Sequence, residues 1–300
     1  MLLIAAGPVA VADQQNEAMV WIEKMSTALR EQNYEGVFNF IRGKEFNTMR
    51  ISHVFKDGHE HERILQLNGE RRDIVRVDDE VFCHHDGNHH TDLEHNVPLG
   101  PFSSKFNEDI NAVKDFYQFT VHGEDRVANR ATVRIAIQPK FQDRFGYRLW
   151  LDKETGLLLQ SHLVDRTRVK EVFQFATLSI GEPIAAESLL AVTDSATVTH
   201  QLMADVIETA ERPTLKVSWL PDGFRPKQVT ANRLHFTDGL ATFSVFIERS
   251  RRMPELQTQM GGTAVITRSL RDNLGQITVV GEVPIATARK VAESVEPVLY

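Results

Sequence analysis

Apolar and polar residues alternate with a helical period near the N-terminus and with a period of two through most of the remaining chain. Residues 16–32 place apolar side chains three and four positions apart, which predicts an amphipathic helix. Residues 34–179 contain short alternating segments separated by tight turns, such as the one at 56–58. Because tight turns join only antiparallel neighbours, these segments predict about ten strands in an antiparallel meander.

A second alternating block ends in an amphipathic helix. Strand patterns recur over residues 215–282, and a proline stands in the first turn of a helix predicted over 284–295. The pattern predicts a smaller C-terminal domain over 213–300, made of one antiparallel sheet and one helix. The whole chain is therefore expected to be α+β, mainly antiparallel β, with two domains.

The N-terminus carries the pattern of an export signal. Residues 1–12 are apolar and end in Ala-Val-Ala, the small-residue edge that signal peptidases cleave, before an abruptly polar stretch. The segment is short and no Lys or Arg precedes it, so we expect a truncated signal; an apolar helix that stays attached is the alternative. We expect a periplasmic protein with an N-terminal domain over 13–182. A linker rich in Ala, Ser, Thr and acidic residues follows over 183–212.

Charge and motifs narrow the class of function. A net charge of −7 over 300 residues gives the chain as a whole no electrostatic reason to bind nucleic acid. The sequence has no glycine-rich phosphate loop, zinc-protease motif or serine-hydrolase motif. We therefore expect a binding protein that uses no cofactor and no metal, not an enzyme.

The single cysteine, Cys83, lies close to five histidines. A thiol with imidazoles is a ligand set for zinc or copper, and a Cys–His pair is also a candidate nucleophile. Neighbouring residues of a strand point to opposite faces, so two adjacent histidines offer only one ligand to one site. We favour a solvated hairpin and a core thiol, with metal binding left open. The histidines are His84, His85, His89, His90 and His95.

The apolar residues of the N-terminal strands indicate where a ligand would lie. A long antiparallel sheet with an aromatic-rich face must cover that face or curl around something. Such a face either packs on helices or forms a concave, lipid-sized pocket. The candidate pocket residues are Phe38, Phe40, Ile51, Phe82, Leu149, Leu151 and Phe173.

Several segments in one order resemble the RseB/MucB family of periplasmic regulators of an envelope-stress sigma factor. In the N-terminal domain they are residues 64–75, ILQLNGERRDIV, and residues 147–157, YRLWLDKETGL. In the C-terminal domain they are residues 217–224, VSWLPDGF, residues 238–245, DGLATFSV, and residues 277–284, ITVVGEVP. The resemblance covers nearly all of the chain that follows the signal segment.

The resemblance implies a fold and a partner. The large domain should be an open half-barrel like that of lipoprotein carriers. The chain should bind the periplasmic segment of a single-span anti-sigma factor of the RseA/MucA type and shield it from proteolysis. Lipid or lipopolysaccharide fragments would cause the protein to release the bound segment. A periplasmic lipid or lipoprotein carrier is the alternative function, and self-association stays open.

The partner surface is expected on the C-terminal domain, because Trp and Arg are frequent anchors of protein interfaces. For Trp219 and Phe243 the alternative is a place in the core. The candidate partner-binding residues are Trp219, Phe224, Arg233 and Phe243.

Overall fold

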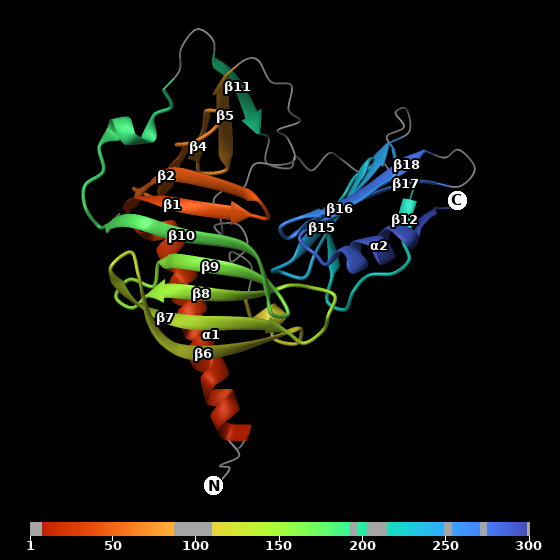
Figure 1. Ribbon diagram of the computed structural model, residues 1–300, viewed down its shortest axis with the longest axis horizontal. Helices are drawn as coiled ribbons and strands as arrows, with labels where there is room; N and C mark the ends of the chain where they lie inside the picture. Colours follow the sequence, from red (N-terminus) through yellow and green to blue (C-terminus); the bar gives the residue numbers. More distant parts are fainter. Residues whose placement is uncertain are drawn as a thin grey trace.

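The structure is a computed structural model that describes residues 8–86, 110–192, 197–202, 215–248, 254–270 and 275–298. Two units lie side by side: a large sheet with a long helix against it, and a smaller sheet with a short helix (Figure 1). We call them the N-terminal and the C-terminal domain. The predicted fold class, α+β and mainly antiparallel β, is confirmed.

Eleven strands form the large sheet, in the order β11-β5-β4-β3-β2-β1-β10-β9-β8-β7-β6. Every neighbouring pair is antiparallel, and the meanders β1–β5 and β6–β10 join where β1 pairs with β10. The strands are β1 Tyr34–Arg42, β2 Glu45–Lys56, β3 His59–Gln66, β4 Arg72–Val77, β5 Glu80–Asp86, β6 Tyr117–Val127, β7 Arg130–Pro139, β8 Gly146–Asp152, β9 Leu158–Asp165, β10 Arg168–Ile180 and β11 Thr197–Leu202.

Helix α1, Pro8–Glu31, crosses one face of this sheet (Figure 1). Its residues Ala18, Ile22 and Met25 recur at helical spacing, and none of their side chains is more than 1% exposed. They belong to one core with apolar residues of the sheet. The helix includes residues 8–12 of the predicted signal segment, and cleavage there stays a prediction.

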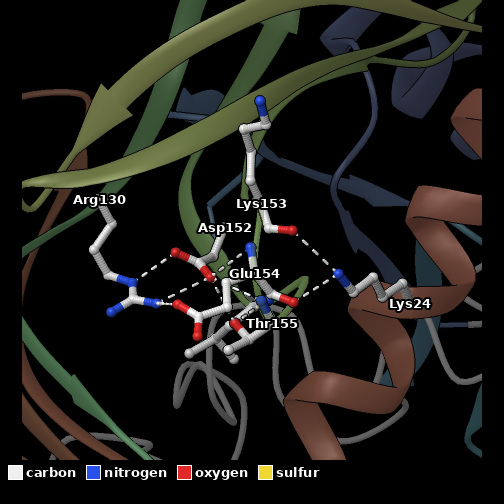
Figure 2. Close-up of polar contacts among 7 residues, drawn as sticks. Lys24, Arg130, Asp152, Lys153, Glu154 and Thr155 are labelled. Carbon is white, nitrogen blue, oxygen red and sulfur yellow. Dashed lines mark hydrogen bonds and ion pairs between the residues drawn. The ribbon is translucent and has the colours of Figure 1, made fainter.

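The turn between β8 and β9 holds α1 against the sheet (Figure 2). Lys24 donates from Nζ to the backbone carbonyls of Lys153 and Glu154, at 3.2 and 2.8 Å. Asp152 shapes that turn, because its Oδ1 accepts from the backbone N–H of Thr155 at 2.8 Å and its Oδ2 from Arg130 Nε at 2.6 Å. We call these six residues the clamp.

Part of the predicted linker packs on the N-terminal domain. Strand β11 pairs with β5, and the 3₁₀ turn Ala186–Leu189 contacts β2 and β3. A buried ion pair holds the chain there: Arg63 binds both carboxylate oxygens of Asp73 at 2.7 Å, and Asp73 accepts from the backbone N–H of Val192 at 3.2 Å. The domain limits remain a prediction, but β11, residues 197–202 of the predicted linker, pairs with the large sheet.

The C-terminal domain is a six-stranded antiparallel sheet in the order β13-β14-β15-β18-β17-β16. Helix α2, Ile285–Glu293, buries Ala288 and Val291 in its core. A separate pair, β12 with β19, completes the domain. The strands are β12 Leu215–Val217, β13 Arg225–Val229, β14 Arg233–Thr237, β15 Thr242–Glu248, β16 Leu256–Met260, β17 Thr263–Ser269, β18 Gln276–Gly281 and β19 Val295–Pro297.

Candidate functional site

Most of the predicted pocket residues lie in a filled core. Five of the seven share the sheet face that α1 crosses, and they belong to one core with the helix. None of these five side chains is more than 3% exposed, so they are packed in the core and not open to solvent. The helix covers this face, which is the alternative that the sequence left open. The five are Phe38, Ile51, Leu149, Leu151 and Phe173.

The other two predicted pocket residues differ from these five: Phe82 lies on the opposite face, whereas Phe40 shares the face of Phe38 and packs, partly exposed, against the core. Phe82 pairs with Val75, which pairs with Arg63, and this register places Phe82 on the opposite sheet face from Phe38. Phe40 lines a hollow of about 250 Å³ on the sheet. The lining residues are Phe40, Arg42, Glu45, Asn47, Met49, Gln66, Glu70 and Arg72.

The hollow combines charge with a small apolar wall. Two arginines and two glutamates balance one another, and Phe40 and Met49 are the apolar members. The Arg42 guanidinium lies 5.2 Å from the ring centroid of Phe40 and 3.3 Å, through Nε, from Glu171 Oε1. This chemistry suits a small ligand that carries an anionic group next to a short apolar group.

The predicted partner residues divide by burial. Phe224 and Phe243 are 7% and 1% exposed and stack in the small core with ring centroids 5.2 Å apart. Trp219 is half-buried against that core, with Lys290 Nζ 3.8 Å from its ring centroid. Arg233 is also half-buried, with its guanidinium 5.6 Å from the ring of Phe246. Trp219 and Arg233 are therefore the members that retain surface for a partner.

The two domains meet around a buried ion pair that the sequence analysis did not single out. Arg144, in the β7–β8 loop, donates from Nη1 to Asp238 Oδ2 at 2.7 Å, and both side chains are 0% exposed. Arg144 also donates from Nη2 to the carbonyl of Asp222 at 2.5 Å and from Nε to Asp143 at 2.7 Å. One guanidinium of the N-terminal domain thus binds two turns of the C-terminal domain.

Tyr117 completes this arrangement. Its hydroxyl donates to Asp238 Oδ2 at 2.9 Å, and burial, reinforced by the Asp238 charge, raises the pKa of Tyr117 well above 10. The hydroxyl therefore stays a donor at any physiological pH. We call Arg144, Asp238 and Tyr117 the central contact. Four aromatic rings surround its guanidinium at centroid distances of 5.2–5.9 Å, namely Phe116, Tyr117, Phe141 and Phe224.

A second contact joins the domains at the turn between β16 and β17. The backbone N–H of Gly262 donates to Glu171 Oε1, on β10, at 2.9 Å. A Cβ on Gly262 would collide with a terminal methyl group of Leu163, so any larger residue would require the Leu163 side chain to move. We call this pair, Gly262 and Glu171, the hairpin contact. Because Arg42 of the hollow also pairs with Glu171, the hollow and the hairpin contact share a residue.

The junction was visible in the sequence only in part. Residues 217–224 and 238–245 carry the family resemblance, and they supply the turns that receive Arg144. Arg144 itself lies 94 residues from Asp238, and no local pattern pairs the two. A charged residue in a loop otherwise rich in aromatic residues, FQDRFGY at 141–147, was the available signal.

The thiol and the histidines show no catalytic arrangement in the part of the chain that the structure describes. Cys83 is buried, and burial raises the pKa of its thiol, which disfavours the thiolate. No cluster of metal-ligating side chains occurs among the described residues; His89, His90 and His95 lie outside them. Among the described helices, none is long and apolar enough to cross a membrane.

Comparison with known proteins matches both domains. The model of the MucB/RseB N-terminal domain matches residues 17–193, and that of the C-terminal domain matches residues 209–296. The sigma factor AlgU regulatory protein MucB of Pseudomonas aeruginosa is 36% identical over 99% of this chain and 96% of its own length. The sigma-E factor regulatory protein RseB of Escherichia coli is 28% identical over 92% and 89%.

Comparison with solved structures finds the same family. A crystal structure of MucB in complex with MucA(peri) covers 94% of this chain and all of that chain, with a TM-score of 0.75 and 32% identity. The complex structure of Pseudomonas aeruginosa MucA/MucB gives a TM-score of 0.74 at 33% identity, over 95% of this chain and 100% of the other. The chain belongs to the MucB/RseB family of sigma factor regulatory proteins.

Proposed function

We propose that this protein binds the periplasmic segment of a MucA/RseA-type anti-sigma factor and shields it from proteolysis in the periplasm. The observation that carries the proposal is the match over both domains to MucB structures that hold MucA. Binding protects by mass action, because a protease cleaves only the free fraction of its substrate. The role is regulatory and not catalytic, in keeping with a thiol whose pKa is raised by burial.

The direct test uses MucA(peri) of Pseudomonas aeruginosa as the probe. We expect saturable binding in calorimetry, with a Kd of about 1 μM or below. The protein should also slow cleavage of MucA by the protease that initiates its destruction, in proportion to the bound fraction. Absence of binding at 50 μM, with a folded protein by circular dichroism, would sink the proposal.

The partner surface is proposed to include Trp219 and Arg233, the predicted residues that keep exposed atoms. Replacement of Arg233 by Ala should weaken MucA(peri) binding about tenfold, as removal of an interface anchor does. Arg225→Ala is the matched control, because Arg225 lies on the neighbouring strand β13 and is exposed. Equal affinities of the two variants would place the surface elsewhere.

We further propose that a lipid fragment weakens the grip by entering the hollow beside Phe40. Its arginines suit a phosphate, and Arg42 links it to Glu171 of the hairpin contact. Dihexanoyl phosphatidic acid, a soluble lipid, should displace MucA(peri) from the protein but not from an Arg72→Gln variant. Retention of displacement by that variant argues against the hollow.

A lipid carrier is the alternative function. It requires an apolar cavity for an acyl chain, whereas α1 fills the aromatic face of the sheet. Stoichiometric transfer of a fluorescent fatty acid to vesicles would favour the carrier; binding of MucA(peri) without such transfer favours the regulator.

A further inference from the structure

We propose that the central contact is a lock that fixes one arrangement of the two domains and thereby positions the partner surface. Arg144, Asp238 and Tyr117 act as positioning residues, since none of them has surface through which to touch a partner. The consequence for partner binding rests on the proposed function; the lock itself is tested without any partner.

The bonds of Asp238 divide between the domains. Its Oδ2 accepts only from the N-terminal domain, from Arg144 at 2.7 Å and Tyr117 at 2.9 Å. Its Oδ1 accepts from the backbone N–H groups of Leu240 and Ala241 in its own turn, at 2.9 and 2.7 Å. One carboxylate thus shapes a turn of one domain and docks that turn on the other.

A buried ion pair of this kind specifies geometry more than it stabilises. The free-energy cost of removing two charges from water is offset only when each charge keeps a full set of hydrogen bonds. A shifted arrangement of the domains would break some of these bonds and leave part of that cost uncompensated. When the domains separate, both charges return to water together, and little net free energy is lost. The pair therefore selects one arrangement and still allows it to open.

Leu240 and Gly223 pack closely on the N-terminal domain beside the central contact. Leu240, only 2% exposed, inserts into the core of the N-terminal domain. Gly223, at φ +85°, lies so close to Phe116 that any Cβ would strike the ring. Close contacts of this sort tolerate little displacement, so together with the charge pair they favour one register.

The hairpin contact supplies a second point of attachment. It joins Gly262 to Glu171 on β10, whereas the central contact lies on the loop between β7 and β8. Two separate points restrict rotation of one domain on the other more than one point does. Loss of the central contact should therefore let the C-terminal domain swing about the hairpin contact.

The test is a double-mutant cycle read by fluorescence transfer between the domains. Dyes are attached at Ala176→Cys, on exposed β10, and Glu293→Cys, on exposed α2. The native Cys83, 0% exposed, should not react. Arg144→Met and Asp238→Asn each leave one buried charge without its partner, whereas the double variant removes both charges and keeps the side-chain volumes.

We expect each single variant to change transfer efficiency and weaken MucA(peri) binding at least tenfold. The double variant also lacks the charge pair, so it should stay altered, and its effect should be smaller than the sum of the two single effects because the residues act as one pair. Tyr117→Phe, which keeps the ring, should give a smaller change of the same sign. Asp152→Asn in the clamp is the control: it should lower thermal stability without changing transfer.

Three outcomes would overturn the lock. They are unchanged transfer in both single variants, a double variant with the transfer efficiency of the wild type, or changed transfer with unchanged affinity. Circular dichroism and thermal melts of each variant separate an open pair of domains from an unfolded one. Failure of the wild-type chain to bind MucA(peri) would count against the proposed function alone, because transfer still decides the lock.

Discussion

The clamp and the central contact use the same chemistry for different ends. In both, an aspartate binds backbone N–H groups of its own turn with Oδ1 and accepts an arginine on Oδ2. Asp152 and Arg130 lie 22 residues apart within one sheet, and the arginine is 28% exposed. Asp238 and Arg144 lie in different domains, with both side chains at 0%.

The difference lies in what happens to the charges when the contact breaks. The clamp cannot open without detaching α1 from a packed core, so its bonds add to the free energy of unfolding. The central contact can open while each domain stays folded. We therefore expect the clamp to govern stability and the central contact to govern arrangement.

The largest effect should follow replacement of Asp152 by Ala. The change removes the turn bonds and leaves Arg130 without its buried partner, so the free energy of unfolding should fall by about 3–5 kcal/mol. Urea denaturation followed by circular dichroism measures it. Lys153→Ala, which keeps the carbonyl that Lys24 binds, is the control and should cost far less. A decrease in the free energy of unfolding below about 1 kcal/mol would show that the clamp does not govern stability more than the central contact does.

Acid should weaken the N-terminal domain through a second carboxylate. Burial opposes ionisation of Glu60, but hydrogen bonds from Arg76 and His53 outweigh it and lower the pKa of Glu60 from 4.5 to about 2. Because the pKa of Glu60 is lower in the folded state than in the unfolded state, its ionised carboxylate stabilises the folded state above about pH 4.5. This contribution is lost as the pH falls through 2.

The expected loss from Glu60 is about 3 kcal/mol, at 1.36 kcal/mol for each pH unit between the two pKa values. Urea denaturation at a series of pH values measures it. Glu60→Gln should be less stable at pH 7 and flatter between pH 5 and pH 2 than the wild type. Parallel pH profiles of the two proteins would contradict this assignment.

Arg144→Met should lower the free energy of unfolding by only about 1 kcal/mol, despite complete burial of the pair. When the domains separate, the Asp238 carboxylate that has lost its arginine becomes hydrated. The variant therefore avoids most of the free-energy cost of an unpaired buried charge. Calorimetric melting of the variant beside Asp152→Ala compares the regions directly. A loss above about 3 kcal/mol would make the central contact a structural element like the clamp.

The sequence predicted the elements better than their meeting points. Alternation located most strands of the large sheet, because burial on one face imposes a period of two. Strand β11 was missed, since six uncharged residues inside an Ala- and Ser-rich stretch give too short a pattern. Phe40 was the one predicted pocket residue that lines the hollow, because alternation gives the face of a residue but not how much of that face the helix covers.

The residues of the junction were harder still. Phe224 was expected on a partner surface, and Phe243 either there or in the core; both are buried, since aromatic residues serve cores and interfaces alike. Arg144 and Asp238 are separated by 94 residues, and charge alone pairs any arginine with many carboxylates. Only the fold brings these two together and removes the water between them.

The smallest expected effect concerns Thr287 on α2, and it sharpens the comparison further. Its Oγ1 donates to the carbonyl of Asp143, next to Arg144, at 2.9 Å, so it adds one neutral bond between the domains. Thr287→Val keeps the shape and should cost about 0.5–1 kcal/mol, with a small shift in fluorescence transfer between the domains. Thr287→Ser, which keeps the hydroxyl, is the control for that shift. If Thr287→Val altered transfer as much as Arg144→Met, neutral bonds and not the charge pair would fix the arrangement.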